Sequence, residues 1–247
     1  MKSTSFIKVI IFIIISSLCI GIFAFLFGSM YIPSYTKDAI SEAENQKYST
    51  VIIDAGHGGE DGGASSAAGL IEKDVNLDIA IILRDLLISN GIDVIMTRDE
   101  DKLLYDRNTD YKGRKKKLDL AARVNMANTT PNAILVSIHM NSFTDPKYSG
   151  MQVWYSPNAP ESFELAEQIR KANQTLLQTD NKRQTKCATS SINLLYNAKC
   201  PAVLVECGFL SNIEEAAKFE KADHRQKVAF VICNSIIEFL EKTKNER

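Results

Sequence analysis

Two of the three histidines in this chain stand at the ends of apolar runs that are typical of buried strands. His57 follows the run VIIDAG and lies in a glycine-rich loop, and His139 ends the run AILVSIH. Because neutral imidazole is the commonest protein metal ligand, this placement indicates a metal site. The ordinary alternative is that each histidine only hydrogen-bonds its neighbours. A phosphate-binding loop is disfavoured, because neither G-x-G-x-x-G nor G-x-x-x-x-G-K-[ST] is present.

Two glutamates are placed to complete such a site. Glu72 stands at the start of a helix-like segment just after the glycine-rich loop, and Glu206 directly follows the four apolar residues AVLV. Two histidines and one carboxylate leave a tetrahedral metal one open position, as in hydrolytic zinc sites, and a further carboxylate can then act as general base. Each glutamate also has an ordinary explanation, as a helix N-terminal charge or as a surface residue at a strand end. An acid after four apolar residues is nevertheless costly unless it is paired or lies in a solvated cleft.

The alternation of strand-like and helix-like runs predicts the scaffold that positions these residues. It predicts one α/β domain with a twisted, mostly parallel or mixed sheet flanked by helices. Ligands bind such sheets at the carboxyl ends of the strands. One predicted strand begins at Val51, and the others cover residues 92–97, 133–139, 150–155 and 202–206. The predicted helices cover residues 73–90, 116–128, 163–176 and 228–240.

The N-terminal residues differ in kind from the rest. Residues 9–27 are nineteen uncharged residues, long enough to span a bilayer, with Lys2 and Lys8 before them and no charge after them until Lys37. This asymmetry predicts a cytoplasmic tip and transmembrane anchor over 1–32, a tether over 33–49 and an extracytoplasmic domain over 50–243. A cleaved signal sequence, giving a secreted protein, is the alternative.

Composition limits the classes of partner and of stabilising bond. Beyond residue 32 there are 27 Lys and Arg against 30 Asp and Glu, a net charge of about −3 that argues against a nucleic-acid partner. The basic run 113–117 is interpreted as a solvated helix face. Five cysteines without a C-x-x-C pair predict neither a disulfide framework nor a cysteine metal site.

Six segments together resemble a known motif set. They resemble, in order and spacing, the zinc-dependent N-acetylmuramoyl-L-alanine amidases, which cleave stem peptides from peptidoglycan. The resemblance extends from Val51 to about Leu240. The segments are VIIDAGHGGEDGGA, GLIEKDVNL, MTRD, LDLAARVNMAN, LVSIHMNS and VECGFLSN.

The resemblance implies an α/β domain with one catalytic Zn²⁺ and peptidoglycan as substrate. Position by position, it implies that His57, Glu72 and His139 are the zinc ligands and that Glu206 is the catalytic glutamate. The single domain and the anchor are similar to the membrane-anchored members that act on the spore cortex in germination. Residues 156–162 are too few for the gating helix of some relatives, so any control would come from elsewhere, for example from a protein activator.

Two other functions compete with this one. A thiol hydrolase would use Cys207 as its nucleophile, although a cysteine after a strand is more often a small buried residue. A membrane-anchored, non-catalytic module would bind peptidoglycan or regulate another enzyme. The presence of His57, Glu72, His139 and Glu206 favours the amidase over both.

Overall fold

The computed structural model describes residues 16–18, 20–23, 47–105 and 113–245. The chain forms two compact units, residues 1–46 and 47–247. Most of the predicted anchor and tether lies outside the described residues, and the seven described residues of the anchor are helical. Within the described ranges, no helix has the length and apolar character that crossing a bilayer requires. The anchor therefore stays a prediction.

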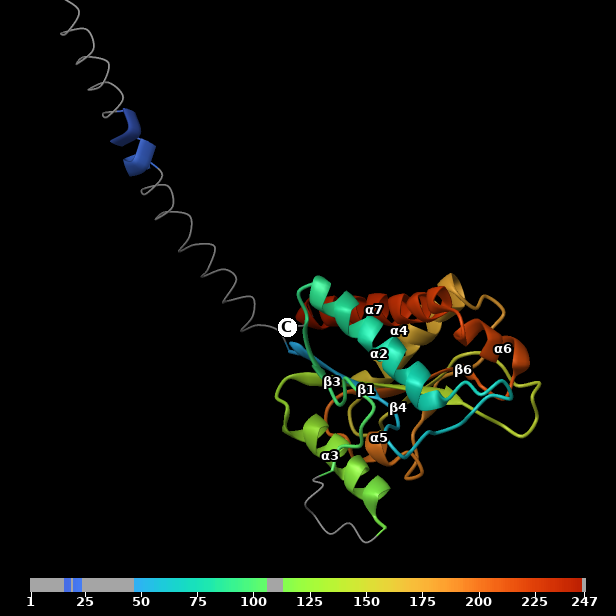
Figure 1. Cartoon of the computed structure of the whole chain (residues 1–247). Coiled ribbons are helices and arrows are strands. Elements are labelled where there is room, and N and C mark those ends of the chain that lie inside the picture. Colours follow the sequence, from blue (N-terminus) through green and yellow to red (C-terminus); the bar gives the residue numbers. More distant parts are fainter. Residues whose placement is uncertain (1–15, 19, 24–46, 106–112, 246–247) are drawn as a thin grey trace, which may run out of the picture. The chain divides into compact units, whose positions relative to one another are not determined.

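The second unit is built on a six-stranded mixed sheet (Figure 1). The strands lie side by side in the order β2-β1-β3-β6-β4-β5, and all neighbours are parallel except β4 and β6. β1, β3 and β6 consequently end at the same edge, the edge that the histidines and Glu206 were expected to share. The strands are β1 (Thr50–Ala55), β2 (Asp93–Met96), β3 (Ala133–Asn141), β4 (Gln152–Tyr155), β5 (Lys186–Cys187) and β6 (Ala202–Phe209).

Helices cover both faces of this sheet (Figure 1). On one face α2, α4 and α7 form the larger core with strand residues such as Ile53 and Val136. On the other face α3 and α5 form a smaller core with Ile52 and Leu135. Successive side chains of a strand point to opposite faces, so the central strands are apolar on both sides. The helices are α2 (Glu72–Ser89), α3 (Lys115–Thr129), α4 (Glu161–Leu176), α5 (Asn193–Asn197), α6 (Ile213–Phe219) and α7 (Ala222–Asn245).

The smaller core is apolar only towards the amino ends of β1, β3 and β6. Towards the carboxyl edge the same face carries Asp54, Ser137, His139 and Glu206 instead of aliphatic residues. These side chains share a face because Asp54 pairs with Ser137 across β1 and β3, and His139 pairs with Glu206 across β3 and β6. The carboxyl half of this sheet face, which faces α3, is therefore polar.

The predicted α/β class, the single folded domain and the mixed sheet are confirmed, but three short elements were not predicted. β5 has two residues and α5 has five, too few to show a period of either kind. α6 did leave a signal, because Asn212 caps it by accepting a hydrogen bond from the backbone N–H of Glu215, the Asn-x-x-Glu spacing of a helix start. β4 is joined to α4 by residues 156–160 alone, so no gating helix is inserted there.

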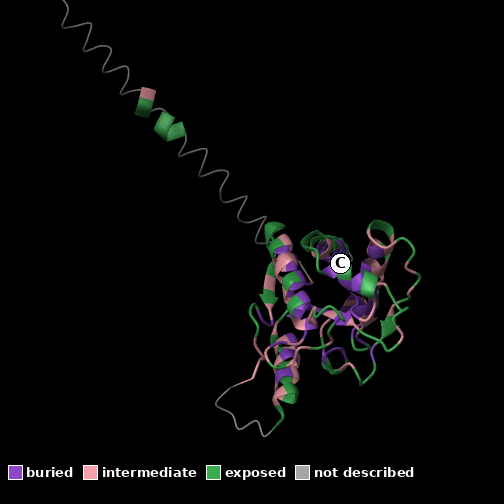
Figure 2. Cartoon of the chain, turned by 45° about the vertical axis from the view of Figure 1, so that its right-hand side comes forward, coloured by how far each residue is buried: buried purple, intermediate pink, exposed green. Residues whose placement is uncertain are grey.

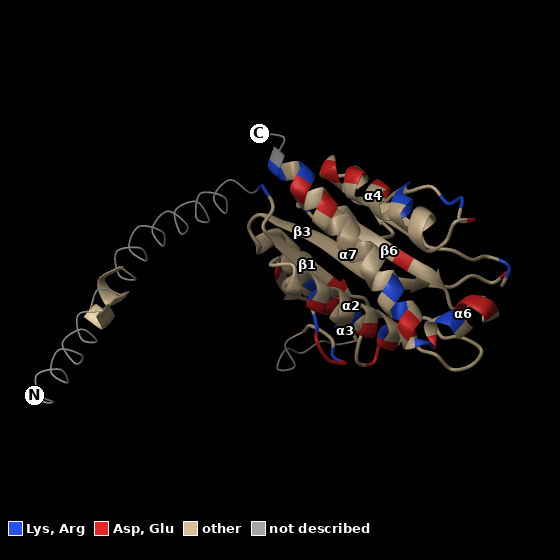
Figure 3. Ribbon diagram, turned by 90° about the horizontal axis from the view of Figure 1, so that it is seen from above, with Lys and Arg blue, Asp and Glu red and all other residues tan. Residues whose placement is uncertain are grey.

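Charge and burial are distributed as in an ordinary amphipathic fold. Buried and exposed residues alternate along the helices in Figure 2, and residues of both charges are interspersed along α7 in Figure 3. The basic run 113–117 is exposed, as predicted, except for the half-buried Lys115. Lys115 lies 2.5 Å from Glu60 and Lys116 lies 3.1 Å from Asp61, so two of its lysines pair with acids of the glycine-rich loop.

Candidate metal and catalytic site

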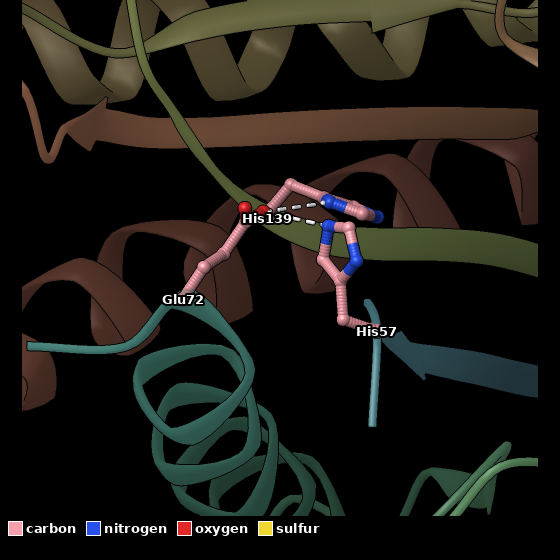
Figure 4. Close-up of side chains that lie close together, drawn as sticks. All are labelled: His57, Glu72 and His139. Carbon is pink, nitrogen blue, oxygen red and sulfur yellow. Dashed lines mark hydrogen bonds and ion pairs between the residues drawn. The ribbon is translucent and has the colours of Figure 1, made fainter. Parts of the chain in front are cut away.

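His57, Glu72 and His139 converge from three different elements (Figure 4). His57 lies in the loop after β1, Glu72 is the first residue of α2, and His139 lies near the end of β3. One ligand atom from each residue lies within 4.8 Å of the other two. Glu72 Oε1 is 3.2 Å from His57 Nε2 and 3.0 Å from His139 Nδ1. The structure thus brings the three predicted ligands together.

Glycines make room for this convergence. A Cβ atom at Gly56 would lie 2.3 Å from the His139 ring, and one at Gly63 would lie 2.4 Å from Glu72 Oε2. Gly63 also has φ +69°, in the left-handed region that favours glycine. A Cβ at Gly63 would also lie 2.8 Å from the His57 ring, so larger residues at these two positions would displace all three side chains.

Glu72 is buried, and its charged form is held by several donors. The backbone N–H groups of Ala64 and Met140 donate to it at 2.7 and 3.1 Å. Burial alone would raise the pKa of this carboxyl, but hydrogen bonds and charge interactions with His139 and His57 outweigh burial and lower it. Glu72 is consequently an anionic carboxylate that faces two imidazoles, not merely a helix N-terminal charge.

Glu206 lies next to this cluster but outside it. It pairs with His139 across β3 and β6 on the same face, and both line a pocket of about 260 Å³ together with His57. Its Oε2 atom is buried and has no hydrogen-bond partner among the described residues. In the metal-free protein burial raises the pKa of Glu206 from 4.5 to about 7, although the neighbouring His139 lowers it by more than the charge of Glu72 raises it. Such a carboxyl can take up and give back a proton near neutral pH.

The remaining acids of the loop are placed differently. Glu60 is exposed and pairs with Lys115. Asp61 Oδ2 lies 3.0 Å from Nδ1 of His57, on the side of the ring away from Glu72. Asp61 therefore contacts the candidate ligand His57 at the ring nitrogen that faces away from Glu72. Neither Glu60 nor Asp61 occupies the position beside His139 that Glu206 holds.

Cys207 cannot serve as the nucleophile of a thiol hydrolase. It follows Glu206 in β6, so its side chain points to the opposite face, where it is fully buried in the larger core. Burial raises the pKa of its thiol far above the ordinary value. The four described cysteines are free thiols: Cys187, Cys200, Cys207 and Cys233.

Sequence reasoning missed a buried ionic network directly behind the site. Arg123 of α3 lies 2.5 Å from Asp54 and 2.8 Å from Asp119, and all three side chains are almost fully buried. Arg98, also buried, donates hydrogen bonds to backbone carbonyls of the glycine-rich loop. One signal was available in the sequence, since Asp54 interrupts an apolar strand and Arg123 falls within a helix face that must pack on the sheet.

The fold and the cluster define an α/β protein with a candidate metal centre at the carboxyl edge of its sheet. Residues 51–238 match the family model described as N-acetylmuramoyl-L-alanine amidase. The chain belongs to the N-acetylmuramoyl-L-alanine amidase family and is thus an amide hydrolase of the bacterial cell wall.

Individual relatives agree with this assignment. The chain is 35% identical over 189 residues to the germination-specific N-acetylmuramoyl-L-alanine amidase of Bacillus subtilis (strain 168), covering 76% of this chain and 78% of that protein. It is similar in structure to the CwlD amidase of Clostridioides difficile, solved in complex with the GerS lipoprotein, with TM-score 0.75, 36% identity and coverage of 78% and 99%. An N-acetylmuramoyl-L-alanine amidase of Clostridium difficile 630 gives TM-score 0.68, 28% identity and coverage of 79% and 98%.

Proposed function

We propose that the chain is a zinc-dependent amidase in which His57, Glu72 and His139 hold the metal and Glu206 is the general base. The reaction is hydrolysis of the amide between the lactyl group of N-acetylmuramic acid and L-alanine in peptidoglycan. The observation that carries the proposal is the position of Glu206, beside the three-residue cluster on the same face but not part of it.

The residues present fit a zinc ion. Two imidazole nitrogens and one carboxylate are a donor set of catalytic zinc sites, and the anionic Glu72 balances part of the charge of a dication. His57 and His139 are partly exposed, and both line the 260 Å³ pocket, so a substrate carbonyl can reach the cluster. When bound, Zn²⁺ would supply a Lewis acid that polarises the scissile carbonyl and lowers the pKa of a water molecule.

Glu206 has the properties that the proton transfers require. Its carboxylate takes a proton from the attacking water and passes it to the leaving nitrogen of L-alanine. Its burial beside His139 keeps the carboxyl close to the cluster and largely out of bulk water, where a general base can act on the attacking water. The unpartnered Oε2 has no competing hydrogen bond to lose.

Product analysis tests the reaction. The purified, zinc-supplied full chain is incubated with defined peptidoglycan fragments, and the products are identified by mass spectrometry. We expect intact glycan strands and stem peptides that begin with a free L-alanine. Cleavage between sugars, cleavage within the peptide, or binding of the fragments without release of peptide would each contradict the proposed reaction, and the last would favour the non-catalytic module.

The cellular setting is a second part of the proposal. We place the catalytic domain on the outer side of the cell membrane, anchored by residues 1–32, because two lysines precede the apolar segment and none follows it closely. Similarity to a germination-specific amidase and to an amidase solved with a lipoprotein supports the spore cortex as substrate and a protein activator as partner.

Protease treatment of cells without a wall tests this topology. An externally added protease should digest the domain that follows Pro33 while the cytoplasmic proteins stay intact. Protection of the domain would reverse the orientation. A soluble mature protein that begins near Tyr31 would instead identify a cleaved signal sequence.

A further inference from the structure

Three consecutive carbonyl groups of the His57 loop are held by two arginines. Arg123 donates to the carbonyl oxygens of Ala55 and His57, both at 2.8 Å. Arg98 donates to the carbonyl oxygens of Ala55 at 2.9 Å and Gly56 at 3.0 Å. Every carbonyl from the end of β1 to His57 therefore receives at least one guanidinium N–H.

The loop needs such support, because its backbone is unfavourable. His57 has φ +62°, a left-handed conformation that few residues other than glycine adopt, and it persists only where the surroundings enforce it. Arg123 bonds the carbonyl of His57 itself. The left-handed conformation of His57 directs its ring towards Glu72. The hydrogen bond from Arg123 to the His57 carbonyl and the orientation of the His57 ring therefore depend on the same backbone angles.

Arg98 also connects the His57 loop to the helix that carries Glu72. Its Nη2 atom donates to the carbonyl of Lys73 at 2.8 Å, one residue beyond Glu72, as well as to Gly56. One guanidinium thus bonds the two segments that supply two of the three candidate ligands. Their separation in the structure is fixed by a planar group with a rigid set of donors.

The burial of Arg98 is expensive for a residue that contributes only to stability. The side chain is 1% exposed, and burial lowers its pKa. Among the described residues it forms no direct ion pair with a carboxylate, in contrast to Arg123, which pairs with Asp54 and Asp119. A buried cation bonded to carbonyls alone is a costly arrangement, so its role is better explained by the geometry that it imposes.

We propose that Arg98 and Arg123 are positioning residues that set the zinc affinity of the site by fixing His57 relative to Glu72. This inference rests on the proposed zinc-binding role of these two residues. Among the described residues, the hydrogen bonds of both arginines go to backbone carbonyls and to Asp54 and Asp119, not to the side chains of the three candidate ligands. Residues that orient metal ligands from outside the ligand set typically change metal affinity by about 10–100-fold when they are replaced.

The test compares zinc binding by the folded full chain with Arg and with Lys at position 98. Arg98→Lys keeps the charge but cannot bond three carbonyls in one plane. We expect about 10–100-fold weaker zinc binding in competition with a chromogenic chelator. We also expect a changed visible absorption spectrum of the cobalt-substituted protein, since that spectrum reports ligand geometry.

The matched control is Ile232→Val, a mild loss in the larger core that lies on the other face of the sheet. It should lower the melting temperature of the metal-free protein without changing zinc affinity or the cobalt spectrum. If Arg98→Lys binds zinc and cobalt as the wild type does, the positioning role is refuted while the zinc site stands. A wild-type chain that binds no zinc would refute the proposed function itself.

Arg123→Lys provides a second, independent variant in case Arg98→Lys does not fold. It retains a cation opposite Asp54 and Asp119 but loses the paired bonds to Ala55 and His57. Weaker zinc binding by the folded variant supports the inference. Unchanged affinity and an unchanged cobalt spectrum would overturn it.

Discussion

Replacing Glu206 with Gln separates catalysis from metal binding and from stability. The substitution keeps the size of the side chain and removes the base. Because Glu206 lies outside the three-residue cluster, Glu206→Gln should retain stoichiometric zinc. Turnover should fall by about two to four orders of magnitude, the usual contribution of a positioned general base.

The structure also predicts the effect of this substitution on stability. In the metal-free protein the pKa of Glu206 rises from 4.5 to about 7, so the charged form is disfavoured by roughly 3 kcal/mol in the folded state. A carboxyl with a raised folded pKa destabilises the fold increasingly as pH rises from about 4.5 through about 7. Gln stays neutral, so the metal-free variant should exceed the wild type in stability at pH 8 and match it near pH 4.

Three measurements on the same preparation decide these points. Zinc content is measured by mass spectrometry, turnover by the release of free amino groups from peptidoglycan, and stability by thermal melting of the metal-free protein at several pH values. One kcal/mol corresponds to about 2–4 °C for a domain of this size. Turnover near the wild-type rate would move the base elsewhere, and loss of zinc would make Glu206 a ligand; either result would refute the assignment.

Three further predictions follow from the site and its supporting network. His57→Ala, Glu72→Ala and His139→Ala should each lose bound zinc together with activity, and full zinc occupancy in all three would show that the ligands are wrong. Chelators should abolish activity while Cys207→Ala stays active, and inactivation of the wild type by a thiol reagent without loss of zinc would revive the thiol mechanism. For Asp54, burial opposes ionisation, but Arg123 and hydrogen bonds outweigh it and lower the pKa from 3.8 to about 2. The charged form therefore contributes about 2 kcal/mol above pH 4, which is lost as pH falls to about 2. The stability difference between wild type and Asp54→Asn, measured by denaturant unfolding, should shrink over that range, and a difference that does not change with pH would contradict the assignment.

The sequence was sufficient for the elements whose pattern is local and long. Val51 and the residues after it, the helix that begins at Glu72, and the strand that ends near His139 could be predicted because hydrophobic period and glycine punctuation mark them. Parallel strands end at one edge, which is why His57, His139 and Glu206 could be expected to meet.

The rest depends on contacts between residues far apart in the chain. β4 runs antiparallel to its neighbour β6. Nothing within the sequence of Gln152–Tyr155 indicates that direction, since it depends on which strand β4 pairs with. The roles of Arg98 and Arg123 depend on backbone carbonyls far along the chain, since Gly56 is 42 residues from Arg98 and Ala55 is 68 residues from Arg123. Charged residues are most often solvated, so pattern analysis does not predict a buried ionic network such as that of Arg123, Asp54 and Asp119.

The most direct test of the account is a crystal structure of the zinc-loaded protein with anomalous data at the zinc absorption edge. We expect one anomalous peak bound by His57, Glu72 and His139, with Glu206 close by but not coordinating. A peak bound by Glu206, or by a set of residues that omits any of the three, would contradict it.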